Sequence, residues 1–222
     1  MSKGIKLLLS GKENSGKSTL TSKIDKALVV VVDAKTYPFS KPHYRIDSYD
    51  GIVDFKNTLI AKIKAYKEKF GELPKTVVID TITKMYELMY LWSEENFKGF
   101  DKFNSINRET LLLNNVIEKT LIEKGINVVI VAHAVWDEGT SSFVIPAMGQ
   151  FAKSGGWLSV VDNASFIYVL GHDRYIAHKE LKYPCRSVLD NIQDSELLDK
   201  YDINEHISRL EETMVESESE AL

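Results

Sequence analysis

Continuous apolar runs alternate along the chain with segments whose apolar residues recur at helical spacing. The runs cover residues 5–10, 27–33, 76–80 and 127–133. Helical stripes are expected at 17–26, 54–70, 84–97 and 108–124, with Gly125 as a stop after the last. Apolar runs without alternation suit parallel strands that are covered on both faces. The pattern therefore predicts an α/β fold with a mainly parallel central sheet and helices on both sides.

The pattern of apolar residues changes after His133. Residues 134–157 contain several glycines and little periodicity, which predicts a mobile loop with a short helix. Runs at 166–170 and 175–179 flank Gly-His-Asp-Arg and predict a C-terminal β-hairpin, with one more strand at 186–189. From residue 194 we expect a helix that gives way to disordered Glu-Ser repeats. These expectations divide the chain into a folded domain over 1–190 and an acidic helix with a tail over 191–222.

Composition adds an asymmetry of charge. The chain has a formal net charge of −4, yet residues 190–222 hold eleven Asp and Glu against two Lys and Arg. No apolar run approaches the roughly 20 residues that a membrane span needs. The single cysteine, Cys185, cannot form an intramolecular disulfide. We therefore expect a cytoplasmic protein with no membrane partner.

The strongest chemical signal is the motif G-x-x-x-x-G-K-[ST], which residues 11–18 match in full. Its glycines let backbone N–H groups approach phosphate oxygens, its lysine reaches the β- and γ-phosphates, and its serine ligates Mg²⁺. The alternative is a chance match in a glycine turn, but a strand precedes the motif and a helix begins within it. The sequence therefore predicts ATP and Mg²⁺ as ligands. The predicted binding residues are Gly11, Glu13, Asn14, Ser15, Gly16, Lys17, Ser18 and Thr19.

A carboxylate closes each of two apolar runs. Asp80 ends Val77-Val-Ile-Asp and, with Ser18, is a candidate Mg²⁺ ligand acting through water. Asp80 could equally be the N-cap of the helix that follows. Asp33 ends the run 27–33 in a similar way.

Three features together resemble the RecA-like P-loop ATPases, in particular the small RecA-like recombinase and single-strand annealing proteins of bacteriophages. They are the loop with Glu13 third and Ser-Gly-Lys-Ser-Thr after it, the strand that closes at His133, and the glycine-containing segment 134–157. The resemblance covers about residues 3–190. It implies that His133 senses the γ-phosphate and signals to a DNA-binding loop. From the residues alone, His133 could also be a strand-end histidine bonded to a backbone carbonyl.

The resemblance also implies partners. Single-stranded DNA would contact Trp136, Lys153 and Trp157 by stacking and phosphate pairing, although each could equally serve loop packing. Basic residues of the hairpin region would reach a neighbouring subunit's ATP in a ring or filament; these are Lys179, Lys182 and Arg186. A single-strand DNA-binding protein is a further expected partner, and a phage-encoded chain would act in the host cytoplasm.

One position departs from the family pattern. RecA-like enzymes carry a water-activating glutamate after the second strand, where this chain has Lys35. A charged lysine cannot accept a proton. Asp33 or Glu138 could substitute, and otherwise hydrolysis is slow. The predicted catalytic set is Lys17, Asp80, His133 and Asp33.

The favoured function is an ATPase that acts on single-stranded DNA in recombination or annealing. A nucleotide kinase is the first alternative, but it needs a lid with several arginines, and no two arginines lie within ten residues of each other. A non-catalytic, ATP-dependent loader or scaffold is the second, because of Lys35. The acidic end is either solubilising or a competitor of DNA phosphates.

Overall fold

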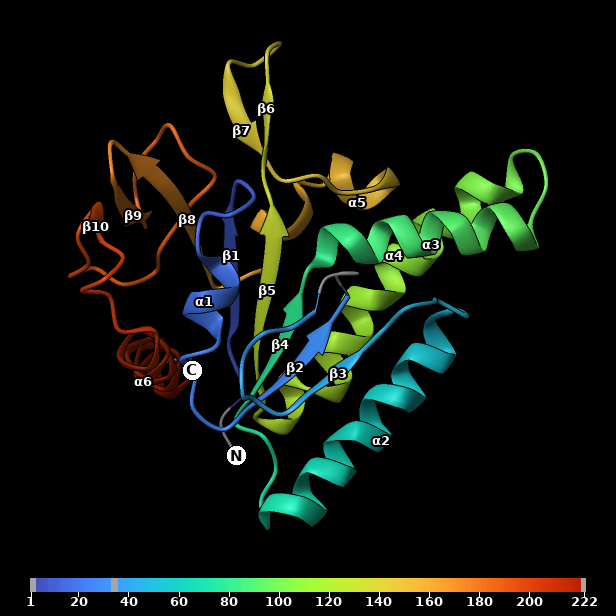
Figure 1. The fold of residues 1–222 in the computed structure, drawn as a ribbon, viewed down its shortest axis with the longest axis horizontal. Coiled ribbons are helices and arrows are strands. Elements are labelled where there is room, and N and C mark those ends of the chain that lie inside the picture. The colour runs from blue at the N-terminus through green and yellow to red at the C-terminus, as the bar shows by residue number, and fades with distance from the viewer. Residues whose placement is uncertain (1–2, 33–35, 221–222) are drawn as a thin grey trace.

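An eight-stranded sheet forms the centre of the computed structural model, which describes residues 3–32 and 36–220, with side chains up to 215. The strand order is β10-β9-β8-β1-β5-β4-β2-β3 (Figure 1). The six strands from β8 to β3 pair in parallel, and β9 and β10 are antiparallel. The strands are β1 (Lys6–Gly11), β2 (Ala27–Val31), β3 (His43–Arg45), β4 (Thr76–Asp80), β5 (Asn127–His133), β8 (Asn163–Leu170), β9 (Asp173–Ala177) and β10 (Ser195–Leu197).

Helices cover both faces of the sheet, as the sequence predicts. One face packs against α2, α3 and α4, and the other against α1 and α6 (Figure 1). Alternate residues of β2 supply the two cores, so that Val30 belongs to the first and Val29 to the second. The helices are α1 (Lys17–Thr21), α2 (Ile52–Phe70), α3 (Ile82–Asn96), α4 (Asp101–Thr120), η1 (Ile122–Lys124), α5 (Gly149–Lys153), η2 (Gly156–Ser159) and α6 (Ile203–Glu220).

The structure differs from the predicted pattern at α1 and in the segment after β5. α1 ends at Thr21 rather than at residue 26, and the Thr21 and Ser22 hydroxyls donate hydrogen bonds to carbonyls of the preceding turn. The segment expected to be a mobile loop contains a β-hairpin, β6 (Val135–Asp137) with β7 (Ser142–Val144), which rises above the end of β5 (Figure 1).

The acidic region after residue 190, as far as the structure describes it, is part of the fold. The expected strand at 186–189 reduces to one bridge between Arg186 and Ala164. The Glu-Ser repeats, expected to be disordered, continue α6 to Glu220. Apolar residues of this acidic region are buried against the sheet, among them Leu198, Ile203 and Leu210. The packing therefore runs across residue 190 without a break.

No helix within the described ranges is both long enough and apolar enough to span a bilayer.

Candidate functional site

The phosphate loop, residues 11–18, joins β1 to α1 at the carboxyl edge of the sheet. Gly11 has a φ of 154° and Gly16 a φ of 103°, which side-chain-bearing residues rarely adopt. A Cβ at Gly11 would lie 2.5 Å from the carbonyl oxygen of Ile167, so no larger residue fits. α1 begins at Lys17, directly after the second glycine. The chain thus forms the glycine-hinged turn between strand and helix that the motif predicts.

Lys17 lies at the centre of this loop and is only 5% exposed. Its Nζ donates hydrogen bonds to the carbonyl oxygens of Gly11 (2.9 Å) and Lys12 (2.6 Å) and to Ser15 Oγ (3.4 Å). Burial lowers the pKa of Lys17 to about 8, and the nearby charges of Asp80 and Glu13 oppose that shift. An anion bound at the loop would favour the charged ammonium, so this environment suits phosphate.

Asp80 ends β4, is 5% exposed and lines the same cavity as Ser18. The sequence left open whether Asp80 caps the next helix. That role belongs to Thr81, whose Oγ1 accepts a hydrogen bond from the backbone N–H of Lys84 at 3.4 Å. No cluster of three metal-ligating side chains occurs within the part of the chain that the structure describes. A Mg²⁺ ion would therefore be held largely by nucleotide oxygens and water, with Ser18 and Asp80 beside it.

His133 ends β5, and β5 lies between β1 and β4 in the sheet. It is in register with Gly11, which places it level with the start of the phosphate loop. Its backbone N–H donates a hydrogen bond to Thr83 Oγ1 at 2.9 Å, and the residue lines the cavity. The role of His133 as a γ-phosphate sensor stays a prediction, now with a position that suits it.

A cavity of about 410 Å³ connects these groups. It is also lined by Tyr37, Phe39 and Arg174, which sequence reasoning did not single out. The Tyr37 hydroxyl is buried and has no hydrogen-bond partner among the described residues. Burial, and then the charge of Asp80, raise the pKa of Tyr37 to about 12. A buried hydroxyl without a partner fits a site that a polar ligand completes.

The catalytic base stays unassigned. Asp33 and Lys35 lie outside the described residues. Glu138 follows β6 at the turn of the hairpin and does not line the cavity. Among the described residues, the carboxylates that line it are Glu13 and Asp80.

Trp157 was wrongly predicted to contact DNA. Its side chain is 1% exposed, its Nε1 donates a hydrogen bond to the Tyr86 hydroxyl at 2.7 Å, and its ring packs edge-on against Phe151. A buried indole whose N–H is already bonded cannot stack on a base. Trp157 is therefore a core residue that joins η2 to α3.

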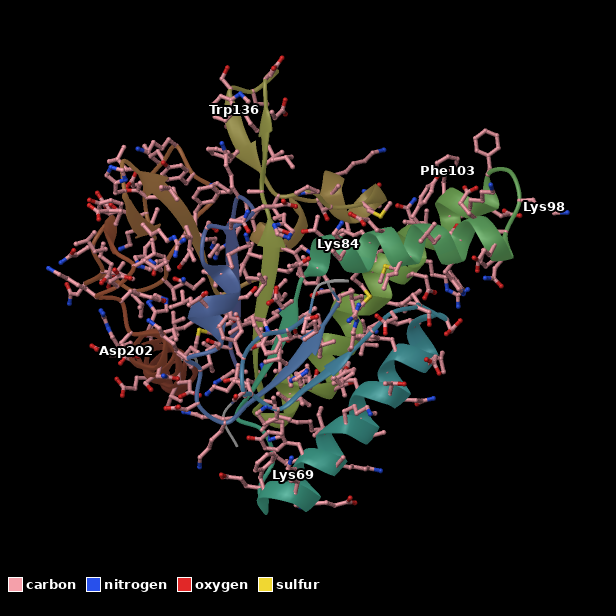
Figure 2. All side chains as sticks on the ribbon, viewed as in Figure 1. Lys69, Lys84, Lys98, Phe103, Trp136 and Asp202 are labelled. Carbon is pink, nitrogen blue, oxygen red and sulfur yellow. The ribbon has the colours of Figure 1, made fainter. Side chains whose placement is uncertain are left out.

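Trp136 is 53% exposed on the β6–β7 hairpin (Figure 2). Its ring lies edge-on to Phe143 of β7, with centroids 5.1 Å apart. The Nζ of Lys12, a phosphate-loop residue, lies 5.2 Å from the centre of the Phe143 ring. The phosphate loop and the hairpin are thus in direct contact. Lys153, the other predicted DNA contact, is exposed at the end of α5.

The three basic residues predicted to act on a neighbouring subunit bond to their own chain outside the cavity. Lys179 donates to the carbonyl oxygen of Asp190, and Lys182 pairs with Glu180 at 3.2 Å. Arg186 donates to a carbonyl oxygen of η2 at 3.3 Å. Their action on a neighbour's ATP remains a prediction.

In the strand order, β5 separates the phosphate-loop strand β1 from the Asp80 strand β4. This order and the site together define the class of the protein, which is a RecA-like P-loop nucleotide-binding protein. A family model described as AAA domain matches residues 3–150, and the chain belongs to this family. Among solved structures, the chain is similar to a KaiC-like protein from the hyperthermophilic archaeon Pyrococcus horikoshii OT3. The two share 13% identity and a TM-score of 0.48 over 88% of this chain and 84% of that one. No curated protein matches the chain.

Proposed function

We propose that this protein binds and hydrolyses ATP with Mg²⁺ and acts on single-stranded DNA in recombination or strand annealing, as phage-type RecA-like proteins do. The observation that carries the proposal is the contact between the phosphate loop and the exposed aromatic hairpin, made by Lys12 and Phe143. Through this contact, a change in the loop on nucleotide binding can reach Trp136. Loops ordered by a bound phosphate are a known type of switch.

The nucleotide side of the mechanism uses the loop amides and the Lys17 ammonium to hold the β- and γ-phosphates. Lys17 would exchange its bonds to the loop carbonyls for bonds to phosphate oxygens, which charge assistance strengthens. Ser18 and Asp80 would hold Mg²⁺, whose charge stabilises the transferring phosphoryl group. His133, whose strand lies between the phosphate-loop strand and the Asp80 strand, would contact the γ-phosphate; its register with Gly11 and its position in the cavity lining support this role.

The DNA side uses the hairpin and its surroundings. Trp136 offers an exposed ring for base stacking. Phe143 packs edge-on against that ring and also contacts Phe166 of β8. Lys153 adds a cation for phosphate on the neighbouring helix α5. In this proposal several copies of the chain assemble as a ring or filament on DNA, with a single-strand DNA-binding protein as a further partner.

The test measures phosphate release and DNA affinity for the wild type and three variants. Lys17→Ala should abolish both release and ATP-dependent stabilisation, which would otherwise be about 2.7 kcal/mol at 100 times the dissociation constant. Trp136→Ala should weaken single-stranded DNA binding by about 5- to 150-fold, the equivalent of one base stack. Phe103→Ala is the matched control, because this aromatic residue is also largely exposed, at 62% against 53% for Trp136, and lies on α4 (Figure 2).

Three outcomes contradict parts of the proposal. ATP consumption that needs a nucleoside monophosphate, converts it to the diphosphate and releases no phosphate would indicate a kinase. ATP binding without release under any condition would indicate a loader or scaffold. Equal DNA affinity of the Trp136→Ala and Phe103→Ala variants would remove the hairpin from the DNA site.

A further inference from the structure

Arg174 at the start of β9 lies against the phosphate loop of its own chain. A Cβ built on Gly16 would be 3.6 Å from Arg174 Cδ and 3.7 Å from its Nη1. The residue lines the same cavity as Lys17 and Asp80. No carboxylate within the described residues forms a salt bridge with this guanidinium, which leaves its donors for a ligand.

The backbone around Arg174 is fixed by strand pairing on both sides. Arg174 is in register with Val169 of β8, and its carbonyl oxygen accepts a hydrogen bond from the backbone N–H of Leu198 at 2.8 Å. Leu198 itself lies close to the loop, since its Cδ2 would be 3.3 Å from a Cβ on Gly16. The hairpin β8–β9 and the segment after β10 therefore fix the backbone of Arg174 beside the loop, and its side chain lies close to Gly16 of the same chain.

We infer that Arg174 is a phosphate-binding residue that acts in cis, on the nucleotide bound by its own phosphate loop. This inference rests on the proposed function and names a ligand contact within it. The guanidinium supplies a second cation beside Lys17 and can bond two phosphate oxygens at once. A cation that RecA-like assemblies can draw from a neighbouring subunit is here contributed by the same chain.

The test uses Arg174→Met, which keeps an unbranched stem against Gly16 and removes the charge, and Arg174→Lys, which keeps the charge. ATP, ADP and AMP affinities are measured by titration over a range of protein concentrations, with light scattering to report assembly. Loss of a charged hydrogen bond predicts about 10- to 100-fold weaker ATP binding for Arg174→Met. The loss should be smaller for ADP, smallest for AMP and partly restored in Arg174→Lys. Arg108→Ala, an exposed basic residue of α4 outside the cavity, is the control and should match the wild type.

The outcomes separate this inference from the proposed function. If the wild type binds ATP no better than Lys17→Ala, the proposed function fails. If the wild type binds ATP and Arg174→Met binds it equally well, only the role of Arg174 fails. An equal loss for all three nucleotides would place Arg174 on the base or ribose, and a loss seen only above the assembly concentration would mean action in trans. Each variant's unfolding temperature without nucleotide confirms that it is folded.

Discussion

Replacing Trp157 tests the boundary between the core and the proposed DNA-binding surface. Its side chain is 1% exposed, and truncating a buried tryptophan to alanine costs about 3–5 kcal/mol. For a chain of this size, each kcal/mol lowers the unfolding temperature by about 2–4 °C, so Trp157→Ala should lower it by roughly 6–20 °C. Trp157→Phe keeps the ring contact with Phe151 but removes the donor to the Tyr86 hydroxyl. That change should cost about 1–3 kcal/mol.

The assay is thermal unfolding followed by far-UV circular dichroism, with single-stranded DNA affinity measured on the same samples below their transitions. Trp136→Ala is the matched comparison, because that ring is 53% exposed and its loss should cost about 1 kcal/mol or less. We expect Trp157 variants to lose stability and keep DNA affinity, and the Trp136 variant to show the reverse. A Trp157→Ala protein with wild-type stability and lost DNA binding would refute the placement of this residue in the core.

Three further predictions concern ionisation and the loop. Because the pKa of Lys17 is about 8 without ligand and phosphate favours its charged form, ATP affinity should fall as pH rises above about 8, by up to about tenfold per unit; calorimetry in buffers of different ionisation enthalpy should show proton uptake. Burial lowers the pKa of His178 to about 4 and that of His206 to about 3, so the unfolded chain binds more protons below about 6.5. Stability to urea should therefore fall between pH 7 and 5, with a slope of up to about 1.4 kcal/mol per unit for each histidine, and an unchanged stability over that range would contradict the prediction. Gly11→Ala should lose both ATP-dependent stabilisation and basal stability, because its Cβ would meet a β8 carbonyl oxygen at 2.5 Å; an unchanged melting curve with ATP would count against the loop geometry.

The parallel core could be predicted because its strands are apolar almost throughout. β2 and β4 are buried at every position, and such runs have few alternatives to a doubly covered sheet. The phosphate loop could also be predicted, because its chemistry requires fixed residue types at fixed spacing. Asp80 needed the structure, because only the observed cap at Thr81 removed its alternative role.

Other features depend on tertiary contacts and could not be predicted from the sequence. Trp157 lies in a segment without periodicity, so nothing in the sequence distinguished a buried indole from an exposed one. A helix was predicted after residue 194, but its acidic composition did not reveal that Ile203, Ile207 and Leu210 pack against the sheet. Arg174 was missed because its closeness to Gly16 arises from the pairing of β8 with both β1 and β9.

The placement of Leu198 and α6 has a consequence for how the protein is made. Leu198 borders Gly16, and Asn204 at the start of α6 bonds to the Lys23 carbonyl oxygen and the Asp25 backbone N–H, across about 180 positions of sequence. During synthesis the early residues leave the ribosome long before these partners exist. In a nascent chain the phosphate loop therefore lacks its contacts with Leu198 and α6 until residues near 210 have emerged. Contacts between residues so far apart in sequence form slowly. ATP would bind only the completed site. ATP present during synthesis would therefore stabilise the folded state and favour the last step of folding.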